Sequence, residues 1–373
     1  MNVMKKLINI LSIGITICLL QACGEEEFPT PEASTIEAKF STQADENDPQ
    51  TISFINETRV ADNAGSVSFV WEFADGSTST EENPTHTYSQ TGIYNVTLVV
   101  TADDDIDTFQ ATVTAIGSLD VNLFFANGSA GLIGELPGSG SIKTGLGTVY
   151  GVDFDSNAEK VYYTDASAGT LMRMNLNGSD EEELLSGLNA ARDVALNLDD
   201  NKVYIVDRGD NAVYEVDINT GTSQILFDYG SGSLGELPIA IDYYDGFLYI
   251  TCVAIGSESV WKGDVNGNSI NVIIDYNDGG YGYGLAIDRV NEKIYFDDTD
   301  SGSILRADLD GSNIESIIAT NGSVYGITID NTNNLIYWSD NGDGLIKKAN
   351  LDGSEIVPVS VSLADPLGLF FIP

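Results

Sequence analysis

A short tetrad that begins with an aromatic residue recurs through the larger part of the chain at nearly constant spacing. Its five clear copies are Tyr162-Tyr163-Thr164-Asp165, Tyr204-Ile205-Val206-Asp207, Tyr249-Ile250-Thr251-Cys252, Tyr295-Phe296-Asp297-Asp298 and Tyr337-Trp338-Ser339-Asp340. Their first residues lie 42, 45, 46 and 42 residues apart, and a weaker copy, Phe124-Phe125-Ala126-Asn127, precedes them by 38. A period of this length indicates a repeat architecture in which each copy is one supersecondary unit.

Each repeat is predicted to contain four short strands. In the copy around Tyr295 these are Tyr283–Asp288, Lys293–Asp297, Ser303–Leu309 and Ile314–Ile318. The third and fourth strands are joined by pairs that tolerate the positive φ angles of a tight hairpin turn: Asn177-Gly178, Asn266-Gly267, Asp310-Gly311 and Asp352-Gly353. Four-stranded units of about 40–45 residues predict the blades of a β-propeller.

The two ends of the repeat region predict how the ring closes. The region begins with a second strand, Asn122–Ala126, which has no first strand before it. It ends with Leu367–Phe371, which aligns with first strands such as Tyr325–Ile329. The last strand is therefore expected to complete the first blade, which gives six blades in residues 118–373 and removes exposed sheet edges.

These repeats resemble the low-density-lipoprotein-receptor class B (YWTD) repeat. The tetrads follow a G-x-A-x-D-like strand and precede a strand that ends in L-D-G, and the resemblance covers residues 118–373. Cys252 replaces the aspartate in one copy. The resemblance implies that the tetrad residues pack between blades and have a structural role.

Residues 36–117 show a second pattern. Alternation of apolar and polar residues predicts strands at Ile36–Phe40, Thr51–Ile55, Val67–Phe73, Tyr94–Val100 and Phe109–Val113. Turn signals such as Asp75-Gly76 separate these strands. The pattern predicts a small β-sandwich.

Three motifs in this segment, Trp71–Gly76, Asn83–Tyr88 and Gly92–Leu98, resemble the polycystic-kidney-disease (PKD) domain. The resemblance implies an Ig-like sandwich whose core contains Trp71, Phe73 and Tyr88. It also implies that His86, the one histidine of the chain, is structural rather than catalytic. Such domains serve as spacers or adhesive modules.

The first 35 residues are interpreted as an address and a tether. Lys5 and Lys6 precede the apolar run Leu7–Leu20, which has the length of a signal-peptide core. The run ends in Leu20-Gln21-Ala22-Cys23, which resembles the bacterial lipobox, so residues 1–22 would be removed and Cys23 would carry a palmitate-bearing diacylglycerol. An ordinary secretory signal with a nearby cysteine is the alternative.

Residues 23–35 are expected to form a lipidated tether. Gly24 after the cysteine implies transfer to the outer membrane of a Gram-negative bacterium, and Glu25–Glu27 resembles a surface-export signal. A plain solvated linker and periplasmic display stay open. With Cys18 removed and Cys23 lipidated, Cys252 would be alone, so no disulfide is expected within the mature chain.

Charge and composition restrict the functions that the chain can have. The chain has 16 basic and 57 acidic residues, a net charge of −41 that repels nucleic acid. Phosphate-binding, zinc and nucleophile-elbow motifs are absent from the sequence. Asp103–Asp105 and Asp298–Gly302 are interpreted as polar turns, with calcium binding left open. We expect no catalytic residue, no cofactor and no metal site.

Two functions stay open. The first is a lipid-anchored binding or adhesion protein, a monomer, whose propeller presents a face to an extracellular protein or polysaccharide on a PKD stalk. The second is a metal-dependent lactonase or lyase of the propeller type. Asp153 would be its metal ligand, but the aligned channel positions in the other blades are Ala195, Ala240, Ala286, Thr328 and Phe370. One carboxylate among these neighbours is a poor cage, which favours binding.

The binding face is predicted where each first strand begins, at one mouth of the central channel. The aligned residues are Tyr150, Arg192, Leu237, Tyr283, Tyr325 and Leu367. Tyrosine and arginine are typical of interface hot spots, so Tyr150, Arg192, Tyr283 and Tyr325 are the predicted ligand-binding residues. The alternative is that the tyrosines only pack against neighbouring blade loops.

Lipidation at Cys23 gives the first testable prediction. The mature chain should partition into detergent, and Cys23→Ser should move it to the soluble fraction because the thiol that carries the anchor is gone. Equal membrane association of the two forms, measured by phase partitioning, would contradict the lipobox interpretation.

Overall fold

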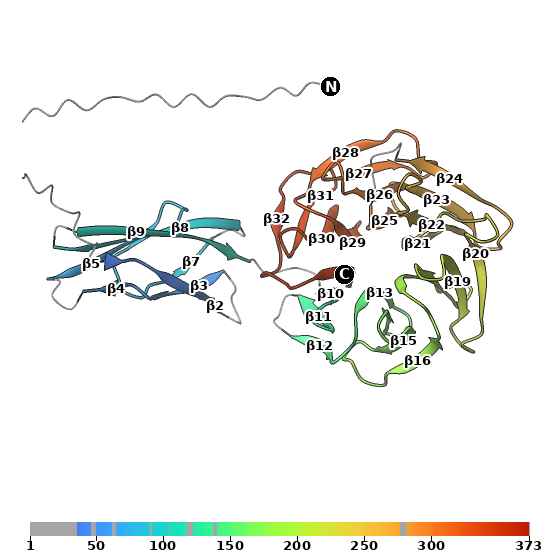
Figure 1. Cartoon of the computed structure of the whole chain (residues 1–373), viewed down its shortest axis with the longest axis horizontal. Helices are drawn as coiled ribbons and strands as arrows, with labels where there is room; N and C mark the ends of the chain where they lie inside the picture. Colours follow the sequence, from blue (N-terminus) through green and yellow to red (C-terminus); the bar gives the residue numbers. More distant parts are fainter. Residues whose placement is uncertain are drawn as a thin grey trace, which may run out of the picture.

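The computed structural model describes residues 36–372 apart from 46–49, 62–64, 90–91, 104, 117–121, 137–139 and 277–281. The predicted signal peptide, Cys23 and the tether lie outside these residues. Within the described part the elements are all β-strands. This part accordingly contains no helix that is long and apolar enough to cross a membrane. Strands β1–β9 form a sandwich and β10–β33 form a propeller, so the predicted all-β class is confirmed (Figure 1).

The sandwich contains one four-stranded sheet and two smaller sheets. The four-stranded sheet has the order β6 (Thr78–Ser79), β5 (Val67–Glu72), β8 (Gly92–Ala102) and β9 (Asp105–Ala115). The smaller sheets are β2 (Phe40–Ala44), β3 (Thr51–Asn56) and β7 (Thr85–Thr87), and the pair β1 (Ile36–Glu37) and β4 (Arg59–Val60). The single strand predicted over Ile36–Phe40 is wrong, because the chain changes sheets at Ala38, whose N–H donates to Asp107 Oδ2 at 2.8 Å.

The sandwich core agrees with the PKD resemblance. Trp71, Phe73 and Tyr88 are all buried. His86 stacks on Phe73 with ring centroids 4.2 Å apart, and its Nε2 lies 2.7 Å from Asp75 Oδ2. These contacts tie the histidine to the core and to the predicted Asp75-Gly76 turn, as a structural residue would be.

The propeller consists of six four-stranded sheets among the described residues, numbered here in chain order. Blade 1 contains β10 (Asn122–Asn127), β11 (Leu132–Leu136), β12 (Ser141–Thr144) and β33 (Pro366–Ile372), and blade 2 contains β13 (Val149–Asp155), β14 (Lys160–Asp165), β15 (Thr170–Asn175) and β16 (Glu182–Ser186). Blade 3 contains β17 (Ala191–Asn197), β18 (Lys202–Asp207), β19 (Ala212–Asp217) and β20 (Ser223–Asp228), and blade 4 contains β21 (Pro238–Tyr244), β22 (Phe247–Cys252), β23 (Ser259–Asp264) and β24 (Ile270–Asp275). Blade 5 contains β25 (Leu285–Asp288), β26 (Lys293–Asp298), β27 (Ser303–Asp308) and β28 (Glu315–Ala319), and blade 6 contains β29 (Val324–Asp330), β30 (Leu335–Asp340), β31 (Leu345–Asn350) and β32 (Val357–Pro358).

The ring closes as the sequence predicts. Strand β33 pairs antiparallel with β10, with Leu369 opposite Phe125, so the last strand becomes the innermost strand of blade 1. Phe370 also stacks on Phe124, with centroids 4.8 Å apart. Strands β13, β21, β25 and β29 surround the centre of the ring, and β16, β20, β24 and β28 lie at its rim (Figure 1).

Many of the acidic side chains cap turns. Asp155 Oδ1 accepts the N–H groups of Asn157 and Ala158 at 2.8 and 3.0 Å, and Asp288 and Asp330 make the same pair of bonds in blades 5 and 6. An aspartate that accepts backbone N–H groups two and three residues ahead stabilises a tight turn. Part of the negative charge of the chain is therefore structural.

Tetrad residues form hydrogen bonds that stabilise several of the innermost strands. Their five tyrosines, Tyr162, Tyr204, Tyr249, Tyr295 and Tyr337, are at most 2% exposed. The third tetrad residue supplies a hydroxyl in three blades. Thr164 Oγ1 accepts the N–H of Gly151 at 3.1 Å and donates to the carbonyl of Arg192, in the next blade, at 2.5 Å. Thr251 and Ser339 accept the N–H groups of Ala240 and Gly326 at 3.1 and 2.7 Å.

Neighbouring innermost strands approach one another closely around the axis. A Cβ atom added at Gly326 would lie 2.3 Å from the carbonyl oxygen of Leu367, and one added at Gly368 would lie 2.5 Å from that of Tyr150. Real Cβ atoms do not come this close to backbone, so these positions require glycine. The narrow channel therefore depends on glycines of the innermost strands.

This close approach predicts the effect of Gly326→Ala. The added methyl group would force blades 6 and 1 apart and lower the free energy of unfolding by about 1–3 kcal/mol, measured by urea denaturation. Gly140→Ala is the matched control, because a Cβ there meets no atom within 4 Å. If the two variants lose equal stability, close packing at the axis is not what requires Gly326.

Candidate functional site

The centre of the propeller holds two neighbouring spaces. The larger, the central cavity, has a volume of about 460 Å³, and the smaller, the mouth pocket, has a volume of about 140 Å³. Asp193, Tyr325 and Gly368 line both of them. A belt of six buried aliphatic residues, one from each innermost strand, surrounds the central cavity: Val152, Val194, Ile241, Leu285, Ile327 and Leu369.

The mouth pocket contains the four predicted ligand-binding residues. Its lining is Tyr150, Arg192, Asp193, Arg208, Ile239, Tyr283, Tyr325, Leu367 and Gly368. Irregular register at the start of the innermost strands helps to aim these side chains. The ladder shifts between Val149 and Val152, between Ala191 and Val194, and between Val324 and Ile327. A β-bulge bends its strand and re-aims side chains, so Tyr150, Arg192 and Tyr325 point to the mouth rather than into the sheet.

The aromatic and cationic groups of the mouth contact one another. Tyr283 and Tyr325 stack with centroids 4.4 Å apart, and the guanidinium of Arg192 lies 3.8 Å from the centroid of Tyr150. Burial, and then the neighbouring Tyr283 and Tyr150, raise the pKa of Tyr325, so its hydroxyl stays protonated at neutral pH. The mouth thus presents hydroxyl and guanidinium donors on an aromatic floor.

One predicted position is wrong, and the cause is a change of register in blade 4. Leu237 has a φ of 56° and lies before β21, with its N–H bound to Asn211 Oδ1 at 2.7 Å. Ile239 takes its place in the mouth pocket. The same change of two residues puts Asp242, not Ala240, opposite Tyr249, as Asp153 lies opposite Tyr162.

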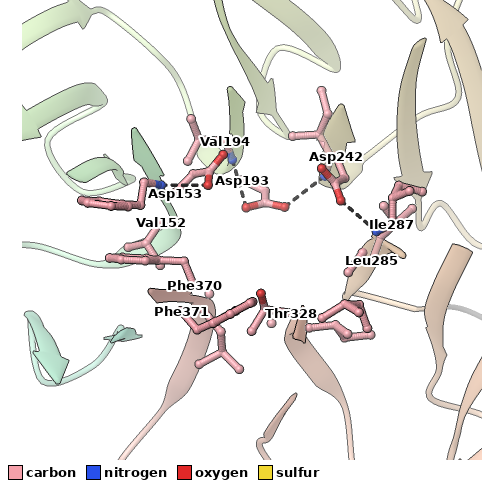
Figure 2. Close-up of a pocket in the computed structure, with 18 of the residues that line it drawn as sticks. Val152, Asp153, Asp193, Val194, Asp242, Leu285, Ile287, Thr328, Phe370 and Phe371 are labelled. Carbon is pink, nitrogen blue, oxygen red and sulfur yellow. Dashed lines mark hydrogen bonds between the residues drawn. The ribbon is translucent and has the colours of Figure 1, made fainter. Parts of the chain in front are cut away.

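The central cavity consequently holds more carboxylates than the sequence alignment indicated. Asp153, Asp193 and Asp242 all line it, and Thr328, Phe370 and Phe371 lie on its opposite side (Figure 2). Asp193 escaped notice because it occupies the position that is glycine in blades 2, 5, 6 and 1. Asp193 follows Arg192 within the bulge of β17, and this irregular pairing is visible only in the structure.

Each of these aspartates joins two blades. Asp153 Oδ1 accepts its own neighbour's N–H, that of Phe154, at 2.8 Å, and Oδ2 accepts the N–H of Leu196 in blade 3 at 3.1 Å. Asp193 binds the N–H groups of Val194 and Ile241 at 2.9 and 3.0 Å, and Asp242 binds those of Tyr243 and Ile287 at 2.7 and 2.8 Å. An innermost strand is an edge strand, so these carboxylates satisfy peptide groups that lack a strand partner.

Burial raises the pKa of Asp153 and of Asp193 to about 7, against the opposing effect of the bound N–H groups. The negative charge of Asp242 is a smaller cause of the same upward shift in both. Asp242 itself forms an ion pair with Arg289 at 2.6 Å. Among the described residues, no three carboxylate, histidine or cysteine side chains converge in a geometry that would hold a metal ion.

The two acidic stretches considered for calcium have backbone partners. Asp103 Oδ2 accepts the N–H of Gly65 at 2.8 Å, and Asp104 lies outside the described residues. Asp298 Oδ1 accepts the N–H of Ser301 at 3.2 Å in the turn between β26 and β27, which is the polar hairpin that the sequence predicts.

Arg208 is a further residue of the mouth pocket that sequence reasoning missed. It follows Asp207, the last residue of its tetrad, and β18 ends at the mouth where β17 begins. The residue directly after a tetrad lies at the same end of the channel as Arg192. The sequence could therefore have predicted that such residues lie near the mouth.

Comparison with known proteins identifies the first domain. Residues 32–116 match the PKD domain family and are a PKD domain. The chain is 35% identical over 114 residues to the pre-pro-metalloprotease PrtV of Vibrio cholerae, covering 28% of this chain and 12% of that protein. It is 38% identical over 74 residues to a microbial collagenase of Vibrio alginolyticus, covering 19% of this chain and 9% of that enzyme. The chain therefore spans only a small part of these relatives.

Solved structures agree with the propeller fold. A chain of the nidogen/laminin complex superimposes with a TM-score of 0.61 at 17% identity, covering 67% of this chain and 98% of that one. TolB from Acinetobacter baumannii gives a TM-score of 0.55 at 11% identity, covering 76% and 80%. At these identities the likeness shows the fold alone. A PKD domain joined to a propeller fits a binding or adhesion role.

The raised pKa values predict how stability depends on pH. Between the unfolded pKa of about 3.9 and the folded value of about 7, the folded state keeps protons that the unfolded state releases. The contribution of Asp153 and Asp193 is thus favourable at low pH and is lost as the pH rises through 7. The melting temperature should fall from pH 5 to pH 8, and the double variant Asp153→Asn/Asp193→Asn should reduce that fall.

The readout is the pH slope, because asparagine accepts only one of the two N–H groups and will lower stability at every pH. Asp199→Asn/Asp300→Asn, at two exposed positions, controls for the change in net charge. An unchanged slope in the double variant would show that the two carboxylates ionise normally in the folded chain.

Proposed function

We propose that this chain is a lipid-anchored binding protein of a bacterial outer membrane, displayed at the cell surface, whose YWTD-type propeller receives an extracellular protein or polysaccharide at the mouth pocket. The PKD domain would act as the stalk between the anchor and the propeller. One observation carries the proposal. Tyr150, Arg192, Tyr283 and Tyr325, which come from four blades, line a single pocket at one end of the channel.

Three features of the mouth support a binding role. Five of its nine lining residues are tyrosine or arginine, two of the types that supply most of the binding energy at protein interfaces. Tyr150, Arg192 and Tyr325 extend from bulges on innermost strands, and the hydroxyls of Thr164 and Ser339 hold two of those bulges. A preformed site of this kind binds with little loss of conformational freedom.

The alternative, a metal-dependent lactonase or lyase, would use the central cavity. Asp242 adds a carboxylate that the sequence alignment did not count. However, both oxygens of Asp153 and of Asp193 accept peptide N–H groups, and Asp242 also pairs with Arg289. These groups serve blade contacts, which favours the binding proposal over the enzymatic one.

Substitutions at the mouth test the proposal. A pull-down from the native environment with the whole chain as bait would identify the ligand. Arg192→Ala and Tyr325→Ala should each weaken its binding by about 1–2 kcal/mol, roughly 5- to 30-fold, because each removes contact area and a polar group from the centre of the face. The melting temperatures should stay close to that of the unchanged chain.

Matched controls exist away from the mouth. Arg59→Ala removes an arginine whose side chain is 85% exposed on strand β4, and Tyr229→Ala removes a tyrosine that is 51% exposed. Both controls should bind normally. The face is wrongly assigned if the two mouth variants also bind normally, or if they lose binding only because they unfold.

A further inference from the structure

The arginines of this very acidic chain fall into two groups. The described residues include six arginines, and Arg59, Arg173, Arg289 and Arg306 each form an ion pair with a carboxylate. Arg192 and Arg208 form none among the described residues, although the chain carries 57 acidic side chains. Both of these arginines line the mouth pocket. The two unpaired arginines are thus gathered at one place.

Each of the two guanidinium groups also has a buried donor without an acceptor. The Nε atoms of Arg192 and Arg208 are buried, and neither has a hydrogen-bond partner among the described residues. Buried polar groups are nearly always hydrogen-bonded, so two exceptions in one pocket call for an acceptor from outside the chain. Arg192 is held in place by its contact with the ring of Tyr150, which leaves the edge of its guanidinium for a ligand.

The nearby acidic groups are turned toward backbone. The carboxylate of Asp207, beside Arg208, accepts the N–H groups of Asn189, Ala190, Gly209 and Asp210 at 2.7–3.0 Å. Asp193, in the pocket itself, accepts those of Val194 and Ile241. Asp365 accepts the N–H of Ser129 and an amide hydrogen of Asn341. None of the three neutralises the arginines by a direct ion pair.

We propose that Arg192 and Arg208 form a carboxylate-binding subsite that takes the side chain of an aspartate or glutamate of a protein ligand. This inference rests on the proposed function. It narrows the class of ligand from protein or polysaccharide to protein. Paired guanidinium groups match the geometry of a carboxylate, which can accept several N–H bonds at once.

The shape of the pocket favours an acidic side chain over a sugar. Its volume of about 140 Å³ is enough for a carboxyl group and its stem. Sugar rings bind aromatic faces, but Tyr283 and Tyr325 stack on each other and Arg192 covers Tyr150. The faces that a pyranose would need are already occupied in part.

Arginine footprinting on the whole chain in detergent tests the subsite. The probe is the blocked peptide acetyl-Gly-Glu-Gly-amide, and acetyl-Gly-Gln-Gly-amide is the matched peptide without the charge. Phenylglyoxal modifies free guanidinium groups, and mass spectrometry reports each arginine separately. The glutamate peptide should slow modification of Arg192 and Arg208 several-fold in a saturable way, the glutamine peptide should not, and Arg59 should be unaffected.

A variant then tests whether the two arginines act together. Arg208→Gln should raise the peptide concentration that half-protects Arg192 by about tenfold, and Arg208→Lys should restore part of the loss, since it keeps the charge without the planar fork. Equal protection by both peptides, or no protection at all, would overturn the subsite. Protection by glucuronate but not by the glutamate peptide would overturn the protein ligand in favour of an acidic sugar.

The outcomes also separate this inference from the proposed function. If Tyr325→Ala loses the captured ligand while the glutamate peptide protects neither arginine, the binding face stands and the carboxylate subsite is wrong. If the peptide protects both arginines while the mouth variants bind the captured ligand normally, the subsite stands and the proposed ligand face is wrong.

Discussion

Close packing of the six innermost strands around one axis is the constraint on which the rest of the propeller depends. The strands come so near that a Cβ at Gly151 would lie 2.6 Å from the Cα of Asp193. At this distance a regular ladder cannot continue to the mouth, and register shifts occur at the start of the strands of blades 2, 3, 4 and 6. The hydroxyls of the tetrads accept N–H groups that the shifts release. The mouth residues are therefore placed by the same geometry that closes the ring.

The inner contacts differ around the ring. Carboxylates join blade 2 to blade 3, blade 3 to blade 4 and blade 4 to blade 5. At the closing blade, the residue aligned with Asp153 is Phe370, which stacks on Phe154 and Phe124 with centroids 5.6 and 4.8 Å apart. Aromatic stacking thus replaces the polar bridge where the last strand meets the first blades. The part of the ring with ionisable bridges is also the part whose stability should respond to pH.

The sequence predicted features that depend on local pattern. Period, turn pairs and the unmatched end strands were enough for six blades and for closure by Leu367–Phe371, because each follows from hydrogen-bonding rules within a blade. Register could not be predicted where no glycine marks the start of the strand. Leu237 and Ala240 were misplaced because Leu237 adopts a positive φ that leucine rarely takes, which moves the start of β21 to Pro238. Asp193 was missed for a related reason, since it occupies a position that is glycine in most blades.

Net charge is a poor guide to the local character of this protein. A chain with a charge of −41 would be expected to lack any surface suited to an acidic partner. Yet the aspartates of the turns, tetrads and channel direct their oxygens to backbone N–H groups, as Asp155, Asp207 and Asp153 all do. Hydrogen bonds of this kind hold the carboxylate oxygens against peptide N–H groups. Two arginines that find no such partner then determine the chemistry of the mouth pocket, because short-range contacts outweigh distant charges screened beyond about 8–10 Å.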